Sequence, residues 1–209
     1  MHFTFKDVLI CRYKLVKGVL ITFLKRECLQ EYVGQMETLV KTQLLTEVKE
    51  SDTILAVPFM KKVTFNLTCT LLFGLHDEPT KEALLEDFTK TMKGLWALPV
   101  NIPGTTYHNA LQARGRIVKS LLPILDCRRK QLSEGAIGRN DDLISGLLSL
   151  RDENNESLRD EEVIDNFVSL MIASHDTTAI LLSLMVWKLA RDSNIYVKVL
   201  EGKQHSITR

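Results

Sequence analysis

The sequence predicts a mainly α-helical protein, and three of its features support that fold class. Apolar residues recur at helical spacing in several stretches, as at Leu84, Phe88 and Met92. Residues that favour turns gather in short clusters between those stretches. Alternating patterns typical of strands are nearly absent. Residues 1–209 are therefore expected to form one helical domain, or the helical part of a mixed fold.

The expected helices follow one another, separated by loops at 76–80, 99–105 and 133–142. Their buried stripes are Leu29, Val33, Met36, Val40 and Leu44; Leu84, Phe88, Met92, Leu95 and Trp96; and Ala110, Leu111, Ile117, Val118, Leu121, Leu122 and Leu125. Residues 54–73 are apolar on most faces, which predicts a more deeply buried helix. Pro123 lies inside the third stripe, where it predicts a kink or a break.

The longest expected helix runs from about Asp160 to Ala190 without glycine or proline. Its acidic start suits a helix N-terminus, and its length is on the order of 45 Å. A helix this apolar is either a membrane span or the central axis of a domain. Because a carboxylate at the centre of a bilayer is costly, Asp176 favours a buried central helix.

Residues 173–179, ASHDTTA, interrupt this apolar helix with a polar cluster. At about 100° per residue, several small or polar side chains fall on one face. They are Asp165, Ser169, Asp176 and Ser183, with Ala173 and Ile180 beside them. Such a face predicts a neighbouring cofactor, ligand or water chain. The structural alternative is that Thr177 and Thr178 bond to carbonyls one turn earlier while Asp176 meets an arginine from another helix.

Composition excludes several classes of function. The 27 basic residues nearly balance the 26 acidic ones, so the charge gives no support for nucleic-acid binding. Four cysteines at long, irregular spacings predict neither a zinc site nor a disulfide framework. They are Cys11, Cys28, Cys69 and Cys127. The adjacent His175 and Asp176 suggest a metal-dependent phosphohydrolase, but no second such pair accompanies them.

The segment Ala-Ser-His-Asp-Thr-Thr, residues 173–178, resembles the I-helix motif of cytochrome P-450 monooxygenases, Ala/Gly-Gly-x-Asp/Glu-Thr-Thr/Ser. Four other segments resemble parts of that family in the same order. They are 23–36 (the helix C to D region), 94–114 (F–G), 157–171 (the lead-in to helix I) and 187–204 (helix J). The similarity is closest to plant enzymes that oxidise triterpenoids and sterols. It implies the helical middle portion of that fold, about helix C to helix J.

The resemblance implies a haem cofactor and assigns residues to it. Asp176 and Thr177 become candidate catalytic residues, because in the family the acid and the threonine deliver protons for oxygen activation. Ala173 would lie over the haem, and Lys17 corresponds to a basic residue near a haem propionate. The expected substrate-pocket residues are Ser169, Ile172, Trp96 and Leu98. Ser174 stands where the family usually has glycine, at the point where its I helix is distorted.

The resemblance implies a haem-dependent monooxygenase that hydroxylates an apolar polycyclic substrate, a triterpenoid or sterol, with O2. An NADPH-cytochrome reductase is the expected partner, at the cytosolic face of the endoplasmic reticulum membrane. The chain includes neither the family's cysteine-ligand loop nor its N-terminal anchor, so it is expected to be an inactive fragment, with the cytosol as the alternative location. A non-enzymatic helical remnant or interaction module is the alternative function.

Overall fold

The computed structural model describes residues 5–50 and 52–207, except for the side chains of 5–12, 26–29, 31 and 203–207. The described chain consists of helices and loops without a strand, which confirms the mainly α-helical prediction. The helices are α1 (Phe5–Phe23), α2 (Arg26–Glu50), α3 (Ala56–Leu67), the π-helical turn η1 (Thr68–Leu72), α4 (Glu78–Leu95), α5 (Thr106–Ser133), α6 (Leu143–Leu148), α7 (Asp160–Arg191) and α8 (Ser193–Ile207).

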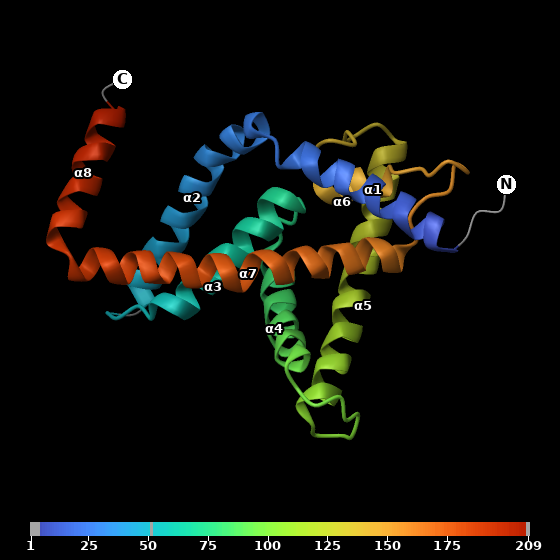
Figure 1. The fold of residues 1–209 in the computed structure, drawn as a ribbon, viewed down its shortest axis with the longest axis horizontal. Coiled ribbons are helices and arrows are strands. Elements are labelled where there is room, and N and C mark those ends of the chain that lie inside the picture. Colours follow the sequence, from blue (N-terminus) through green and yellow to red (C-terminus); the bar gives the residue numbers. More distant parts are fainter. Residues whose placement is uncertain (1–4, 51, 208–209) are drawn as a thin grey trace.

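The long helix α7 runs through the middle of the molecule, and the other helices are arranged around it (Figure 1). α3 packs along α7, and α2 contacts α3. α4 and α5 form a hairpin that projects away from α7 to a loop at 96–105. α1 packs on α6 near the start of α7, while α8 turns away from its end. The polar motif of α7 therefore lies near the centre of the molecule.

The hydrophobic core lies where α3, α4, α5 and the first part of α7 meet. Phe73 stacks against Phe167 of α7 with ring centroids 4.2 Å apart, and Phe65 meets Phe88 at 5.8 Å. Met171 of α7 is fully buried among these elements. From Phe59 to Leu75 most side chains are buried, so the deeply buried segment predicted at 54–73 is confirmed apart from its first residues.

Side-chain caps set the helix boundaries. Asp77, Thr105 and Asp142 accept hydrogen bonds from the backbone N–H groups three residues later, at 2.9, 3.2 and 2.8 Å. The loop predicted at 133–142 is confirmed within one residue, and the loop predicted at 99–105 begins three residues earlier, at 96. The loop predicted at 76–80 lies three residues earlier, at 73–77, because the Asp77 cap starts α4 at Glu78.

Each of the three predicted stripes is wrong in part, because no described neighbour covers some of its members. On α2, Val33 and Leu44 are exposed, while the side chain of Leu29 lies outside the described residues. Trp96 ends α4 and is 91% exposed rather than buried. The third stripe is confirmed at Ala110, Ile117, Leu121 and Leu125, and Leu111 is exposed.

Pro123 does not break its helix. α5 continues from Thr106 to Ser133 with Pro123 inside it, on the exposed side. A proline removes one backbone hydrogen bond, and the carbonyl that loses its donor can turn to water when it faces solvent. Of the two predicted outcomes, the break is therefore wrong, and the kink stays a prediction.

The bounds predicted for the longest helix are confirmed, but only part of it is buried. α7 has the length and composition of a membrane-spanning helix. Up to Ala179, one side of it packs into the core. Beyond Ala179, Ser183 is its one buried residue, and most of the large apolar side chains are exposed. They are Ile180, Leu181, Leu184, Met185, Val186 and Trp187. The central-helix prediction is therefore right for the first two thirds of α7 and wrong for the last third.

The α4–α5 hairpin depends on a close approach at Gly94. A Cβ atom added at Gly94 would lie 2.2 Å from the Cβ of Ala110, far inside van der Waals contact. About two turns along the same interface, Arg116 binds both carboxylate oxygens of Asp87, at 2.6 and 3.1 Å, which raises the pKa of the guanidinium. The hairpin is therefore packed backbone to backbone at its tip.

Gly94→Ala is expected to lower the free energy of unfolding by about 1–3 kcal/mol, because overpacking must push α4 away from Ala110. Urea unfolding followed by circular dichroism measures the change. Gly115→Ala is the matched control, since no atom lies within 4 Å of the added Cβ. That variant should gain up to about 1 kcal/mol from helix propensity. Equal effects of the two substitutions would contradict the close approach.

Candidate functional site

The motif 173–178 lies on an undistorted stretch of α7, which is α-helical from Asp160 to Arg191. The helix distortion that the resemblance implies is therefore not present in this structure. The hydroxyl of Ser174 contacts the carbonyl of Met171 at 3.4 Å, within the helix. Helical rotation divides the motif between two surfaces. His175 faces the core, Ala173 and Thr177 are exposed, and Asp176 lies at the border.

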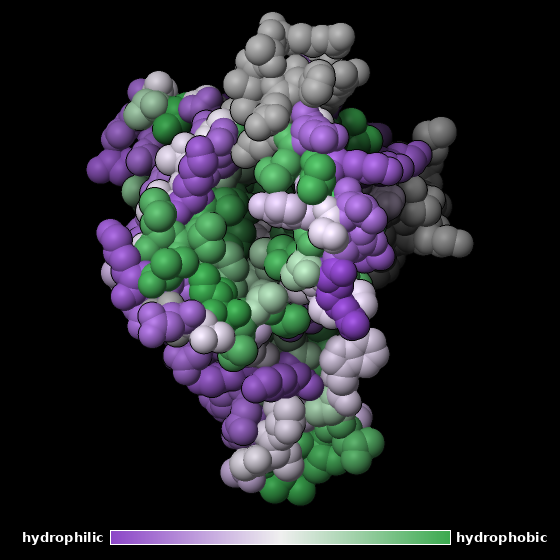
Figure 2. Space-filling view, turned by 90° about the vertical axis from the view of Figure 1, so that its left-hand side faces the viewer, coloured by the Kyte–Doolittle hydropathy of each residue, from purple (hydrophilic) through white to green (hydrophobic). Residues whose placement is uncertain are grey.

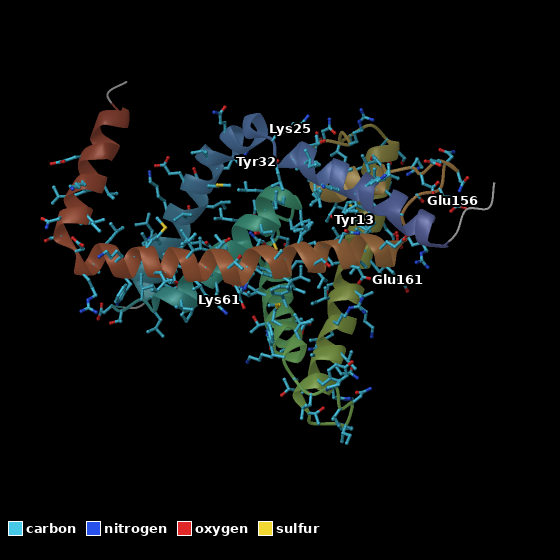
Figure 3. All side chains as sticks on the ribbon, viewed as in Figure 1. Tyr13, Lys25, Tyr32, Lys61, Glu156 and Glu161 are labelled. Carbon is cyan, nitrogen blue, oxygen red and sulfur yellow. The ribbon has the colours of Figure 1, made fainter. Side chains whose placement is uncertain are left out.

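Asp176 is held by a lysine from another helix. The Nζ atom of Lys61, on α3, lies 2.7 Å from Oδ1 of Asp176, and both side chains are 38% exposed. Figure 3 labels Lys61 where α3 passes beneath α7 in that view. The lysine is the main reason that the pKa of Asp176 is lowered, with a smaller contribution from His175. Asp176 is therefore ionised at neutral pH.

His175 is buried between aromatic rings. Its side chain is 4% exposed, with edge-on contacts to Phe65 of α3 at 6.0 Å and Phe88 of α4 at 5.4 Å between ring centroids. Burial lowers the pKa of the imidazole, although Asp176 and the Lys61 carbonyl act in the opposite direction. The ring is therefore neutral, and Nδ1 lies 2.9 Å from Oδ1 of Asp176.

One of the two threonines of the motif makes the contact that the structural alternative predicts for both Thr177 and Thr178. Thr177 Oγ1 donates to the carbonyl of Ala173 at 2.9 Å, one turn earlier. Its proton is used there, so the exposed hydroxyl presents lone pairs as acceptors. Asp176 likewise meets a cation from a neighbouring helix, but this cation is a lysine and not the arginine of the structural alternative. These contacts hold both groups in place at the edge of an exposed face.

The polar stripe predicted on α7 does not form one surface. Ser183 is buried, and its hydroxyl donates to the carbonyl of Ala179 at 2.8 Å. Asp165 forms an ion pair with Arg114 of α5. Ser169 is exposed and Asp176 is shared with α3. The prediction of one small-polar face is wrong because the core of this protein covers part of that face.

The other expected site residues are scattered. Ile172 is half-buried beside Ala173 on α7, but Trp96 and Leu98 are exposed in the loop at the far tip of the α4–α5 hairpin. The structure therefore does not bring the hairpin residues together with those of α7. Lys17 is exposed on α1, which packs on α6.

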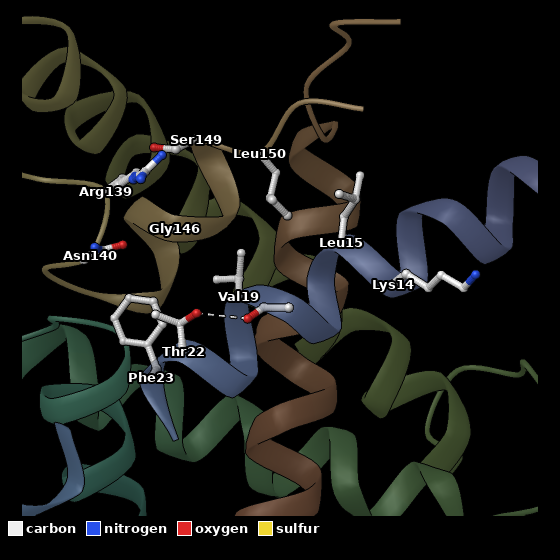
Figure 4. Close-up of a pocket in the computed structure, with 11 residues that line it drawn as sticks. Lys14, Leu15, Val19, Thr22, Phe23, Arg139, Asn140, Gly146, Ser149 and Leu150 are labelled. Carbon is white, nitrogen blue, oxygen red and sulfur yellow. Dashed lines mark hydrogen bonds between the residues drawn. The ribbon is translucent and has the colours of Figure 1, made fainter. Parts of the chain in front are cut away.

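A cavity of about 440 Å³ lies between α1 and the loop and helix at α6, away from the motif (Figure 4). Lys14 and Arg139 lie at opposite sides of it, and Val19 and Phe23 supply apolar walls. The volume is within the range of small-molecule pockets, about 300–1,000 Å³. It includes no residue of the motif, so it is not the expected substrate pocket.

An exposed line on α7 has the character needed to face a flat, apolar cofactor. Its members are Ser169, Ala173, Thr177, Ile180 and Leu184, and none of them is charged. Ala173 is small, and Thr177 supplies the hydroxyl. Figure 2 views the molecule from the α8 end and shows a large hydrophobic area there. The residues present therefore fit one face of a haem.

The described cysteines do not offer a thiolate to that face. Cys69 is fully buried in η1, and burial raises the pKa of its thiol to about 12. Cys127 is exposed on α5, beside a different cavity. The side chains of Cys11 and Cys28 lie outside the described residues. Among the described residues, no group of three His, Cys, Asp or Glu side chains could hold a metal ion.

Sequence reasoning missed Lys61 as a partner of the motif. The available signal was a pair of lysines, Lys61 and Lys62, inside the apolar stretch 54–73. A cation in such a segment usually has an anionic partner. Which anion it meets depends on how α3 packs on α7, and that packing is not encoded in the local spacing.

The buried neutral ring of His175 predicts a pH dependence of stability. Because its pKa is lowered from 6.5 in the folded chain, the unfolded chain binds the proton first as the pH falls. Stability that depends on the neutral ring is fully present above about 6.5 and is lost below it. The free energy of unfolding should therefore fall more between about pH 7.5 and 5.5 in the wild type than in His175→Leu, by at most about 1.4 kcal/mol per pH unit.

Urea titrations at the two pH values measure this difference. His76→Leu is the control, because His76 is exposed in the loop before α4. Asp176 does not interfere, since its pKa is lowered from 3.8 and its effect lies below this range. The same pH dependence in the wild type and His175→Leu would contradict the burial of a neutral ring.

Comparison with known proteins identifies the family of this chain. The cytochrome P-450 family model matches residues 12–208. A taxane 13-alpha-hydroxylase of Taxus cuspidata is 31% identical over 188 residues, covering 90% of this chain and 39% of that protein. A beta-amyrin 28-monooxygenase of Medicago truncatula is 32% identical over 184 residues, covering 88% of this chain and 38% of that protein. The chain thus spans about two fifths of the length of these relatives.

A solved structure shares the fold. The cyanobacterial CYP120A1 bound to retinoic acid has a TM-score of 0.78 and 24% identity, and the match covers 90% of this chain and 42% of that chain. At this identity the likeness concerns the fold. Together with the Asp-Thr-Thr motif at the centre of α7, the match over residues 12–208 shows that the chain belongs to the cytochrome P-450 family, of which it forms a helical part.

Proposed function

We propose that this chain forms the oxygen-facing wall of a haem-dependent monooxygenase. The observation that carries the proposal is the division of the α7 motif between two surfaces. Thr177 and Ala173 stand on an exposed, uncharged line, and Asp176 is held at its border by Lys61. A hydroxyl and an ionised carboxylate on consecutive residues suit the delivery of protons to a group on that line.

The α7 line would hold one face of the haem. Ala173 leaves room above it, and Ile180 and Leu184 extend the apolar contact. When bound, haem with a thiolate ligand activates molecular oxygen for insertion into a C–H bond. We assign that thiolate to neither Cys69 nor Cys127, given their positions. The inactivity of the isolated chain stays a prediction.

Asp176 and Thr177 supply proton chemistry in this proposal. The carboxylate is ionised and partly exposed, so it can take a proton from solvent and release it toward the exposed face. Thr177 donates to the Ala173 carbonyl in this structure. The O–H bond must turn away from that carbonyl, by rotation about the Cβ–Oγ1 bond, before Thr177 can donate its proton to another acceptor. The helix thus offers a proton carrier and a switchable donor side by side.

The substrate we assign is an apolar polycycle, a triterpenoid or a sterol. The exposed α7 line has no charge to pair with a charged ligand, whose desolvation would be costly. The relatives include a beta-amyrin 28-monooxygenase and a taxane 13-alpha-hydroxylase, both named for polycyclic terpenoids. By the same family argument, the partner is an NADPH-cytochrome reductase and the location is the cytosolic face of the endoplasmic reticulum membrane.

The proton roles can be tested in a chimera in which residues 12–208 replace the matching segment of the Medicago beta-amyrin 28-monooxygenase. Thr177→Ala should uncouple it: NADPH consumption continues, more hydrogen peroxide forms, and product falls by about tenfold or more. Asp176→Asn should lower turnover by about 10²-fold or more, with substrate affinity retained. Product, peroxide and NADPH are measured together.

Asp165→Asn is the matched control, because Asp165 is an exposed acid of the same helix, paired with Arg114. Its coupling should equal that of the unmodified chimera. If Asp176→Asn and Thr177→Ala also leave coupling and turnover unchanged, both residues have only the structural roles seen in their hydrogen bonds.

The substrate assignment can be tested at Ser169, which is exposed on α7 one turn before Ala173. In the same chimera, Ser169→Phe should narrow the site and reduce turnover of a pentacyclic triterpene by about tenfold or more, because overpacking excludes the bulkier ligand. Turnover of a monoterpene, assayed in parallel, should change little. An equal loss of turnover for both substrates, or a preference of the unmodified chimera for the monoterpene, would contradict the substrate assignment.

A further inference from the structure

The carboxylate of Asp176 is bound through one of its two oxygens only. Lys61 Nζ at 2.7 Å and His175 Nδ1 at 2.9 Å both contact the same oxygen, Oδ1. No described side chain donates a hydrogen bond to Oδ2. One oxygen of Asp176 is therefore fully engaged, and the other remains available as an acceptor.

The proton on His175 can be assigned from this contact. An ionised carboxylate accepts hydrogen bonds and cannot donate them, so the neighbouring Nδ1 of the neutral ring carries the hydrogen. Nε2 is then unprotonated, and it is buried without a hydrogen-bond partner among the described residues. The only side-chain hydrogen bond of the imidazole among the described residues is the one to Asp176, and the Lys61 carbonyl lies close enough to act on the pKa of the ring.

The two donors differ in rigidity. Lys61 is 38% exposed and carries a flexible four-carbon stem, and exposed ion pairs of this kind constrain geometry weakly. His175 is 4% exposed and is fixed between Phe65 and Phe88. Its backbone carbonyl is also reached by the hydroxyl of Thr64, at 3.5 Å. His175 is therefore the donor that can define where the carboxylate points.

We propose that His175 is a positioning residue, which orients Asp176 by engaging Oδ1 and so leaves Oδ2 free to handle a proton. The inference deepens the role proposed above for Asp176 and rests on it for its functional meaning. It predicts that the ring acts through its Nδ1–H group and not merely by filling space. The titratable groups that act on Asp176 are Lys61 from α3 and His175 itself.

The test compares variants of the 209-residue chain that separate packing from hydrogen bonding. His175→Phe keeps an aromatic ring in the site and removes the donor. His175→Asn loses the ring but places an amide N–H close to the position of Nδ1–H. Lys61→Met removes the ion pair and leaves the histidine intact. Met171→Leu, a buried change on the same helix without contact to Asp176, is the matched control.

Two nuclear magnetic resonance measurements report on Asp176 directly, without haem. Three-bond couplings give its χ1 rotamer populations, and the ¹³C shift of its carboxyl carbon gives its pKa. We expect one dominant rotamer in the wild type, in His175→Asn, in Lys61→Met and in Met171→Leu. In His175→Phe we expect rotamer averaging and a pKa above that of the wild type, because the donor is lost.

A single rotamer and an unchanged pKa of Asp176 in His175→Phe would overturn the proposal, since packing of an aromatic ring would then be sufficient to orient the carboxylate. Averaging in Lys61→Met would overturn it as well, because the lysine would be the orienting group. If His175→Phe does not fold, the smaller His175→Leu carries the same comparison. These outcomes are independent of the coupling assay. Unchanged coupling in Asp176→Asn would contradict the proposed function, but it would leave the proposed orientation of the Asp176 side chain by His175 standing.

Discussion

The packing of α3 along α7 is the contact on which the rest of the site depends. Phe65 of α3 covers the ring of His175, and this contact fixes the rotation of α7 about its own axis. At about 100° per residue, Ala173 and Thr177 lie roughly 160° from His175, so they must face away from the core. Asp176 then falls at the border, within reach of Lys61.

The apolar contacts, and not the ion pair, set this geometry. Burial of a large side chain such as Phe65 or Met171 contributes about 1.5–3 kcal/mol. A half-exposed pair such as Lys61 and Asp176 contributes about 0–1 kcal/mol. The ion pair is therefore a consequence of the packing. It still affects the chemistry, because it lowers the pKa of a carboxylate that borders an otherwise uncharged surface.

Helical periodicity predicted the positions of the helices well, and it predicted less well which of their faces are exposed. The acids at 160–162 and the absence of glycine and proline gave the correct bounds of α7. The same angular reasoning grouped Asp165, Ser169, Asp176 and Ser183 on one polar face, which the structure divides. The error has a physical reason: a serine that donates to its own helix carbonyl can be buried, so its polarity does not mark an exposed surface.

The sequence by itself determined the mainly helical fold, the long α7 helix and the family resemblance, because these follow from local spacing and from a short motif. The tertiary structure alone decided that Lys61 is the partner of Asp176, that His175 is buried, and that Trp96 and Leu98 stand apart from the motif. Helical spacing fixes the angles between residues of one helix. How the helices pack together decides which side of a helix faces the core and which side chain of another helix lies against it.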